Sequence, residues 1–218
     1  MVHIGKSSPM IKPVVALGVL ICLAALAAPA QPQRFDYYLL ALSWTPSFCE
    51  AEGDAEDREQ CEPGQDFGFT LHGLWPQYED GWPEFCDSAR RDPSRRQTGA
   101  MADIMGSGGL AWYQWKKHGR CTGLDAADYF DAAREAYKAI AIPPVSGGIE
   151  LRASELEQAF LDANDDLDAD TVIVTCRDDL VREVRICLNR DLAPRACAPD
   201  VERAACSYRG RLDLPPIR

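Results

Sequence analysis

Eight cysteines follow an N-terminal segment typical of exported proteins, and this combination constrains the fold more than any other feature. Residues 1–12 carry two lysines and no acid, residues 14–27 are apolar or small, and Ala28-Pro29-Ala30 has the small-x-small pattern of a signal-peptidase site. The apolar run is shorter than the ~20 residues that span a bilayer. We therefore predict a secretory signal peptide over residues 1–30, with an uncleaved membrane anchor as the alternative.

Removal of residues 1–30 takes away one cysteine, two lysines and no acid, so that the net charge of −11 becomes −13 and 188 of the 218 residues remain. This length suits one globular domain over residues 31–218. An even number of cysteines in an exported chain predicts a disulfide framework, but eight cysteines can pair in about 105 ways and spacing alone does not choose. The remaining cysteines are Cys49, Cys61, Cys86, Cys121, Cys176, Cys187, Cys197 and Cys206.

Helix and strand patterns are mixed without regular alternation, which predicts an α+β fold around an antiparallel sheet flanked by helices. Pro76 is expected to end the second strand, and Ser154 with Glu157 to form a capping box at the third helix. The acidic residues 50–62 are expected to form a solvated loop, and Pro215-Pro216 to close a mobile tail. Strands are predicted over residues 34–44, 67–75, 171–176 and 180–188, and helices over residues 110–119, 124–142 and 154–162.

The acidic composition argues against a broad, non-specific nucleic-acid binder, which needs an extended basic face. It is compatible with an enzyme that brings a few cations to a phosphate. Beyond residue 30 the chain has two histidines, His72 and His118. One protonated and one neutral imidazole can remove a proton at one end of a reaction and deliver a proton at the other.

Each histidine lies in a distinctive context. His72 follows the second strand pattern, and His118 ends a helix pattern in which Gln114 and Lys117 share its face. Ala111, Trp112 and Trp115 are expected to mark the opposite, buried side. Either histidine alone is also compatible with a purely structural role. Two histidines without a neighbouring Cys or His cluster make a weak case for zinc, which needs three or four ligands.

Two segments carry a resemblance to a known family. Residues 69–76 (FTLHGLWP) resemble the first active-site signature of the ribonuclease T2 family, and residues 110–121 (LAWYQWKKHGRC) resemble the second, in the family's order. The resemblance implies an α+β fold and cleavage of single-stranded RNA, without a metal or other cofactor, through a 2′,3′-cyclic phosphate. It also implies broad base preference.

The resemblance further implies a role for each matching residue. His118 is expected to act as the base and His72 as the acid in the first step, with Lys117 stabilising the phosphoryl oxygens. Gln114 stands where the family most often has Glu; it can donate a hydrogen bond but cannot act as acid or base. The expected substrate-binding residues are Trp75, Gln77, Tyr78 and Tyr113, and for Trp75 and Tyr113 packing is the alternative role.

The resemblance also implies the disulfide pairs Cys49–Cys61, Cys86–Cys121, Cys176–Cys206 and Cys187–Cys197. We expect a monomer, periplasmic or secreted, that has no stable membrane association once the signal is removed. The basic cluster of Arg90, Arg91, Arg95 and Arg96 either guides RNA or forms a solvated loop. Two alternatives remain: a binding protein on the same scaffold with weak or lost catalysis, and a metal-dependent phosphodiesterase, which would need more ligands than two imidazoles.

Overall fold

The computed structural model describes residues 1–3, 35–56 and 58–218, so the predicted signal peptide lies almost entirely outside the described residues. The described residues from 35 to 218 form one unit by their contacts. Among the described residues, no helix has both the length and the apolar character needed to cross a membrane.

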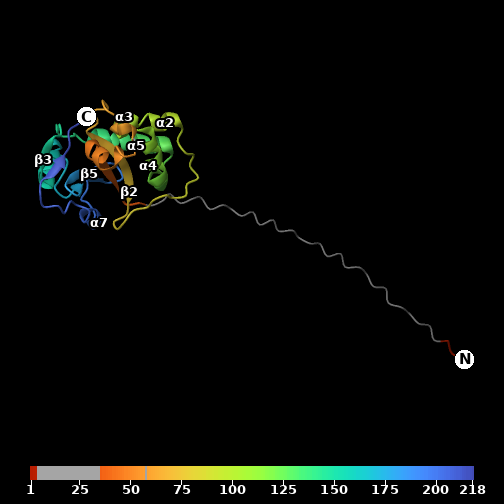
Figure 1. Cartoon of the computed structure of the whole chain (residues 1–218). Coiled ribbons are helices and arrows are strands. Elements are labelled where there is room, and N and C mark those ends of the chain that lie inside the picture. Colours follow the sequence, from red (N-terminus) through yellow and green to blue (C-terminus); the bar gives the residue numbers. More distant parts are fainter. Residues whose placement is uncertain (4–34, 57) are drawn as a thin grey trace. The chain divides into compact units, whose positions relative to one another are not determined.

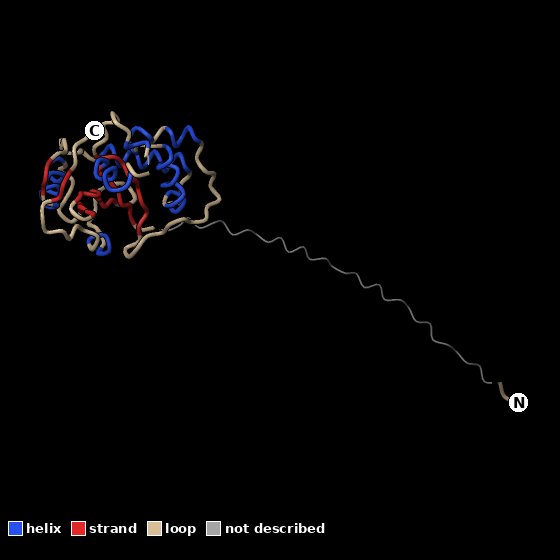
Figure 2. Tube along the Cα trace, viewed as in Figure 1, coloured by secondary structure: helices blue, strands red, loops and turns tan. Residues whose placement is uncertain are grey.

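A six-stranded sheet organises this unit (Figure 1). β1 pairs antiparallel with both β2 and β5, β4 pairs antiparallel with β5, and β6 joins the sheet beside β5 and pairs with β3. Strands and helices are mixed as predicted, and the α+β fold class is confirmed (Figure 2). The strands are β1 Tyr37–Trp44, β2 Phe69–Gln77, β3 Ile149–Leu151, β4 Val172–Arg177, β5 Leu180–Leu188 and β6 Leu212–Leu214.

The main core forms where helices pack on one face of the sheet. Leu40 and Leu42 of β1 and Val184 and Ile186 of β5 belong to it, together with apolar side chains of α3, α4, α5 and α6. A smaller cluster on the other face contains Leu39 and residues of α7. The helices are α1 Thr45–Phe48, α2 Arg95–Gly99, α3 Ala102–Met105, α4 Gly108–Lys117, α5 Ala126–Ala139, α6 Ala153–Ala163 and α7 Pro199–Glu202.

Two predicted element ends are wrong. Pro76 lies inside β2, which continues to Gln77; β2 is an edge strand, where a residue without an N–H is tolerated. The cap of α6 lies two residues before the predicted Ser154, because the Arg152 N–H donates to Glu155 Oε2 at 2.7 Å. Glu157 instead accepts a hydrogen bond from the Val174 N–H at 3.0 Å.

The C-terminal segment is also not the free tail that the two prolines suggest. Leu212 and Leu214 are fully buried in β6, and Trp44 Nε1 donates to the Pro215 carbonyl at 2.9 Å. The sequence pattern there is too short to predict a strand, and burial by neighbouring strands decides the structure.

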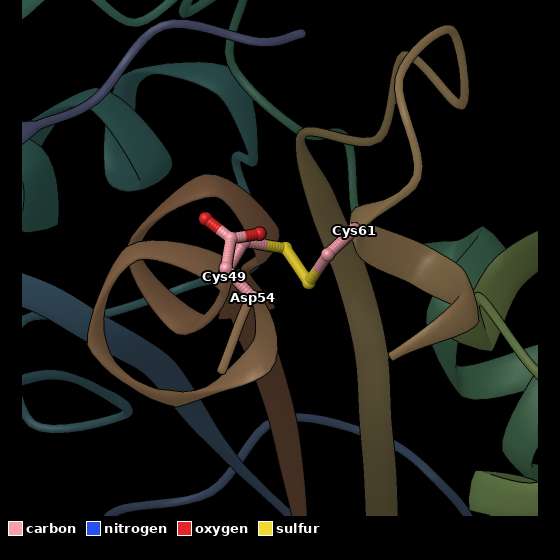
Figure 3. A group of neighbouring side chains, drawn as sticks. All are labelled: Cys49, Asp54 and Cys61. Carbon is pink, nitrogen blue, oxygen red and sulfur yellow. A yellow bond between two sulfur atoms is a disulfide. The ribbon is translucent and has the colours of Figure 1, made fainter. Parts of the chain in front are cut away.

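Four disulfides tie the described residues together, and they are the same four pairs that the resemblance implies: Cys49–Cys61, Cys86–Cys121, Cys176–Cys206 and Cys187–Cys197. The first closes the acidic segment, which forms short helical turns rather than an irregular loop. Figure 3 shows Asp54 beside this bridge. Both sulfur atoms are bonded to each other, and Asp54 accepts a hydrogen bond from Arg218 at 2.8 Å, so this group offers no thiolate for a metal.

Candidate active site

One pocket of about 440 Å³ brings together most of the residues that the sequence singled out. Its walls come from β1, β2, the C-terminal half of α4, β5 and the α7 region. Tyr78 is the one predicted site residue outside this lining; its side chain is exposed next to the pocket. The predicted residues that line it are His72, Trp75, Gln77, Tyr113, Gln114, Lys117 and His118.

A β-bulge in β2 places His72 and Trp75 in the same pocket. Ala41 of β1 pairs with Gly73 and Leu42 pairs with Leu71, which leaves His72 as the extra residue. Side chains three residues apart on a regular strand point to opposite faces of the sheet. The extra residue of the bulge shifts the alternation by one, so that side chains three apart across it point to the same face. Leu71 and Leu74 therefore both reach the core, while His72 and Trp75 both line the pocket.

A second bulge acts in the same way on β5. Thr175 of β4 pairs with Glu183 and Cys176 pairs with Val181, which leaves Arg182 as the extra residue. Val181 is consequently buried in the core, whereas Glu183 faces the pocket.

Helix α4 contributes the second half of the site. The Ser107 hydroxyl caps its first turn by accepting from the Leu110 N–H at 3.1 Å, and the helix ends at Lys117 with His118 as its cap. Gln114 and His118 are buried, as are Ala111 and Trp115. Gln114 and His118 thus lie on the buried side of the helix, and the expectation that this side is opposite to the site residues is wrong.

The prediction for Trp112 is wrong, because this side chain is 37% exposed. At 100° per residue, position 112 lies outside the arc that contains residues 111, 114, 115 and 118. That arc is the one that packs on the sheet.

Trp75 connects the two histidines. Its ring stacks on His118 with centroids 5.2 Å apart and meets His72 edge-on, also at 5.2 Å. Its Nε1–H donates to Gln114 Oε1 at 2.7 Å. An indole nitrogen only donates, so this bond fixes the Gln114 oxygen toward Trp75 and leaves the NH₂ group free to donate elsewhere.

Gly73 leaves the space that this hydrogen bond occupies. A Cβ atom at Gly73 would lie closer than 3.0 Å to both Trp75 Nε1 and Gln114 Oε1. The glycine in the first signature is therefore explained by a close approach of two polar side chains.

His118 is held in its neutral form. Burial, followed by the positive charges of Lys117 and His72, lowers its pKa to about 3. Its Nδ1 is buried and has no hydrogen-bond partner among the described residues. A neutral imidazole in a pocket can accept a proton.

His72 has a charged partner that the sequence analysis missed. Its Nδ1 lies 2.6 Å from Glu183 Oε1, and Glu183 is only 1% exposed. Burial raises the pKa of Glu183, but the hydrogen bond with His72 and the nearby positive charges outweigh burial and lower the pKa to about 2. A signal for Glu183 does exist in the sequence, since it is an acid inside the strand pattern LVREVRICL.

Lys117 is positioned by the segment that follows β2. Its Nζ lies 3.4 Å from Glu84 Oε2, and its carbonyl accepts from the Phe85 N–H at 2.8 Å. The Cys86–Cys121 disulfide joins the same segment to the turn after α4.

The remaining candidates divide between pocket and surface. Tyr113 is 47% exposed and borders both the main pocket and a neighbouring cavity of about 310 Å³ that His72 also lines. The four arginines of the basic cluster are exposed and do not line the main pocket. Further lining residues that the sequence analysis did not single out are Trp82, Arg182, Arg185, Asp200 and Arg203.

The described residues thus form a disulfide-braced α+β domain with two imidazoles, an amide and a lysine around one pocket. The chain belongs to the ribonuclease T2 family, whose family model matches residues 35–197. It is 40% identical over 129 residues to a ribonuclease of Aeromonas hydrophila, with 58% of this chain and 57% of that protein covered. It is 31% identical over 147 residues to Ribonuclease I of Escherichia coli, with 49% and 54% covered.

The chain therefore spans just over half the length of these curated relatives. Solved structures share its fold. An RNase-related protein from Calystegia sepium matches with a TM-score of 0.65 at 21% identity, covering 85% of this chain and 99% of that one. RNase NT in complex with 5′-AMP matches with a TM-score of 0.59 at 19% identity, covering 84% and 100%.

Proposed function

We propose that this chain is an endoribonuclease that cleaves single-stranded RNA by transphosphorylation through a 2′,3′-cyclic phosphate, with broad base preference. The observation that carries the proposal is the pair of imidazoles that both pack against Trp75 in one pocket, each with its centroid 5.2 Å from that of the Trp75 ring. The ribonuclease names of the relatives and the family match support the same activity.

In the proposed first step, neutral His118 removes the proton of the ribose 2′-hydroxyl. The 2′-oxygen attacks phosphorus, the bond from phosphorus to the 5′-oxygen breaks, and His72 delivers a proton to that leaving oxygen. Hydrolysis of the cyclic phosphate would reverse the two roles. DNA lacks the 2′-hydroxyl and so cannot react in this way.

Two further groups are proposed to stabilise the charge that grows on the phosphoryl oxygens. Lys117 provides an ammonium group, and Gln114 provides the NH₂ donors that its bond to Trp75 leaves free. Donors fixed before the reaction are effective because they need no reorganisation. A glutamine suits this role because its amide donates without carrying a charge.

The bases are proposed to bind on aromatic and polar groups at the rim. Tyr113 and Trp82 are exposed at the pocket and offer rings for stacking, which every base can use. Gln77 lines the pocket, and Tyr78 follows it with an exposed ring just outside. Stacking with few fixed polar contacts favours broad base preference.

We further propose that residues 1–30 are a cleaved secretory signal and that residues 31–218 act as a periplasmic or secreted monomer. The lysines, the apolar run and the small-x-small ending of the segment support export, and four disulfides suit an oxidising compartment. The proposed substrate is single-stranded RNA, and the reaction as written uses no metal.

The test is cleavage of a labelled single-stranded RNA by the purified protein in excess EDTA, followed by end-group analysis. Fragments that end in 2′,3′-cyclic phosphate are expected, and a DNA of the same sequence should stay intact. Dependence on a divalent metal, or equal cleavage of DNA, would exclude this mechanism. RNA binding without any cleavage would instead support a binding protein on the same scaffold.

A further inference from the structure

We propose that Glu183 is a positioning residue that orients His72 and stabilises its protonated form for delivery of a proton to the leaving group. The proposal rests on the assignment of His72 as the general acid. It assigns a function to a residue of β5 that lies outside both signature segments.

The first support is the geometry of the carboxylate. Glu183 Oε1 contacts His72 Nδ1 at 2.6 Å, and Oε2 accepts from Arg185 Nε at 2.9 Å and lies 2.8 Å from Arg185 Nη2. Each oxygen thus has its own partner. An ionised carboxylate only accepts, so Nδ1 must carry the hydrogen and Nε2 is the nitrogen left for the substrate.

The second support is the burial of the charge. A buried carboxylate without a partner is strongly unfavourable, so Glu183 is stabilised only while its partners are present. Arg185 also lies over the Trp75 ring at 5.5 Å, which links the Glu183–Arg185 pair to the aromatic ring that contacts both histidines. Strand β5 therefore contacts both His72, through Glu183, and Trp75, through Arg185.

The third support is the amide at position 114. The family resemblance leads one to expect a carboxylate there, on α4, and this chain has a glutamine. Glu183 supplies a negative charge from the opposite wall, on β5, in contact with the other histidine. The negative charge of Glu183 therefore acts on His72, the proposed proton donor, and not on His118, the proposed base.

Other charges also surround His72 and must be considered in any pH dependence. Lys117 and His118 approach from α4, and Arg58 and Glu59 border the neighbouring cavity. Glu183 is distinguished from these because it is hydrogen-bonded to the ring. The further charged groups of the main pocket are Arg182, Arg185, Asp200 and Arg203.

The test compares two substrates whose leaving groups differ in their need for a proton. Uridylyl-3′,5′-adenosine releases a ribose 5′-oxygen that must be protonated, whereas uridine 3′-(4-nitrophenyl phosphate) releases a nitrophenolate that leaves without a proton. Glu183→Gln should slow the first reaction by about 10- to 100-fold, the usual effect of losing a charged hydrogen bond, and the second by less than about threefold.

The matched control is Glu157→Gln. Glu157 is a half-buried carboxylate that accepts a backbone hydrogen bond from β4 and does not line the pocket. It should leave both rates unchanged. If Glu183→Gln does not fold, the two substrates are compared in Glu183→Asp. The shorter side chain withdraws the carboxylate from His72 Nδ1, so the dinucleotide reaction should again slow more than the nitrophenyl reaction.

Equal slowing of both substrates would overturn the proposal, because a general loss of structure does not depend on the leaving group. A second readout needs no turnover. The downfield proton resonance of His72 Nδ1–H should be present in the native full chain and in Glu157→Gln, and should move upfield in Glu183→Gln, because an amide oxygen is a weaker acceptor than a carboxylate. An unchanged position of that signal in Glu183→Gln would overturn the proposal, whether or not the native chain cleaves RNA. Failure of the native chain to cleave either substrate would by itself count only against the proposed ribonuclease activity.

Discussion

Replacement of Gly73 by alanine should impair catalysis while leaving the fold intact. The backbone at Gly73 is not in the left-handed region, so alanine introduces no conformational strain. Its methyl group would instead occupy the space between Trp75 Nε1 and Gln114 Oε1. Gln114 Oε1 is at the end of a flexible side chain, whereas Trp75 Nε1 belongs to a rigid ring that packs on both histidines. We therefore expect the Gln114 side chain to move away rather than the strand to distort.

The size of the effect follows from the hydrogen bond that is lost. Separation of a buried donor from its acceptor costs about 1–3 kcal/mol. Each ~1.4 kcal/mol corresponds to a tenfold change in rate, so kcat/KM for RNA should fall by roughly 10- to 100-fold. Gln114→Ala removes the same bond, and the double variant should therefore be little worse than either single one.

The assay is kcat/KM on a dinucleotide, measured beside urea unfolding and tryptophan fluorescence. Gly99→Ala is the matched control, because a Cβ atom there meets nothing within 4 Å and the backbone again needs no positive φ. Its activity should equal that of the native chain. Native kcat/KM in Gly73→Ala would refute the argument that the Trp75–Gln114 bond orients a catalytic amide.

Three other perturbations test separate parts of the site. His72→Ala and His118→Ala should each lower kcat by about 10²–10⁴-fold, with the double variant well short of the product of the two losses in single-turnover assays. The pKa of His118 is lowered from 6.5 to about 3 in the native chain. Between these pH values, position 118 is therefore protonated in the unfolded chain and neutral in the native chain. The free energy of unfolding should therefore fall as the pH decreases below 6.5, by up to ~1.4 kcal/mol per pH unit, and urea titrations should show a shallower fall in His118→Gln. Joint replacement of Cys86 and Cys121 by serine should lower the free energy of unfolding by about 2–5 kcal/mol, measured in urea, and reduce activity through the displaced Lys117.

The sequence predicts the long elements well and the short ones poorly. The range of β5 agrees fully with its apolar run, and α4, α5 and α6 differ from their predicted ranges by a few residues. β3 and β6 were missed because three residues carry too little periodicity, and their pairing comes from distant parts of the chain. The extension of β2 through Pro76 depends on its place at the sheet edge, which no local pattern encodes.

The composition of the pocket was predictable from two signatures, but its arrangement was not. Regular alternation puts His72 and Trp75 on opposite faces of β2, and Val181 and Glu183 on the same face of β5. Both expectations fail because each strand contains a bulge. A bulge is visible only in the pairing with a neighbouring strand, so Glu183 could be noticed in the sequence as an unusual acid but not connected to His72.

The charge of the pocket opposes the charge of the chain, as the proposed action of an acidic protein on a polyanion requires. Across the whole chain acids outnumber Lys and Arg by 34 to 23. The pocket reverses this balance, since its cations are Lys117, Arg182, Arg185 and Arg203 and its carboxylates are Glu183 and Asp200. Charges on the distant surface are screened over about 8–10 Å at ordinary ionic strength, whereas those in the pocket act at contact distance. For the proposed RNA substrate, a phosphate in the pocket would meet mainly the local cations, while the acidic remainder of the chain would disfavour non-specific binding along the strand.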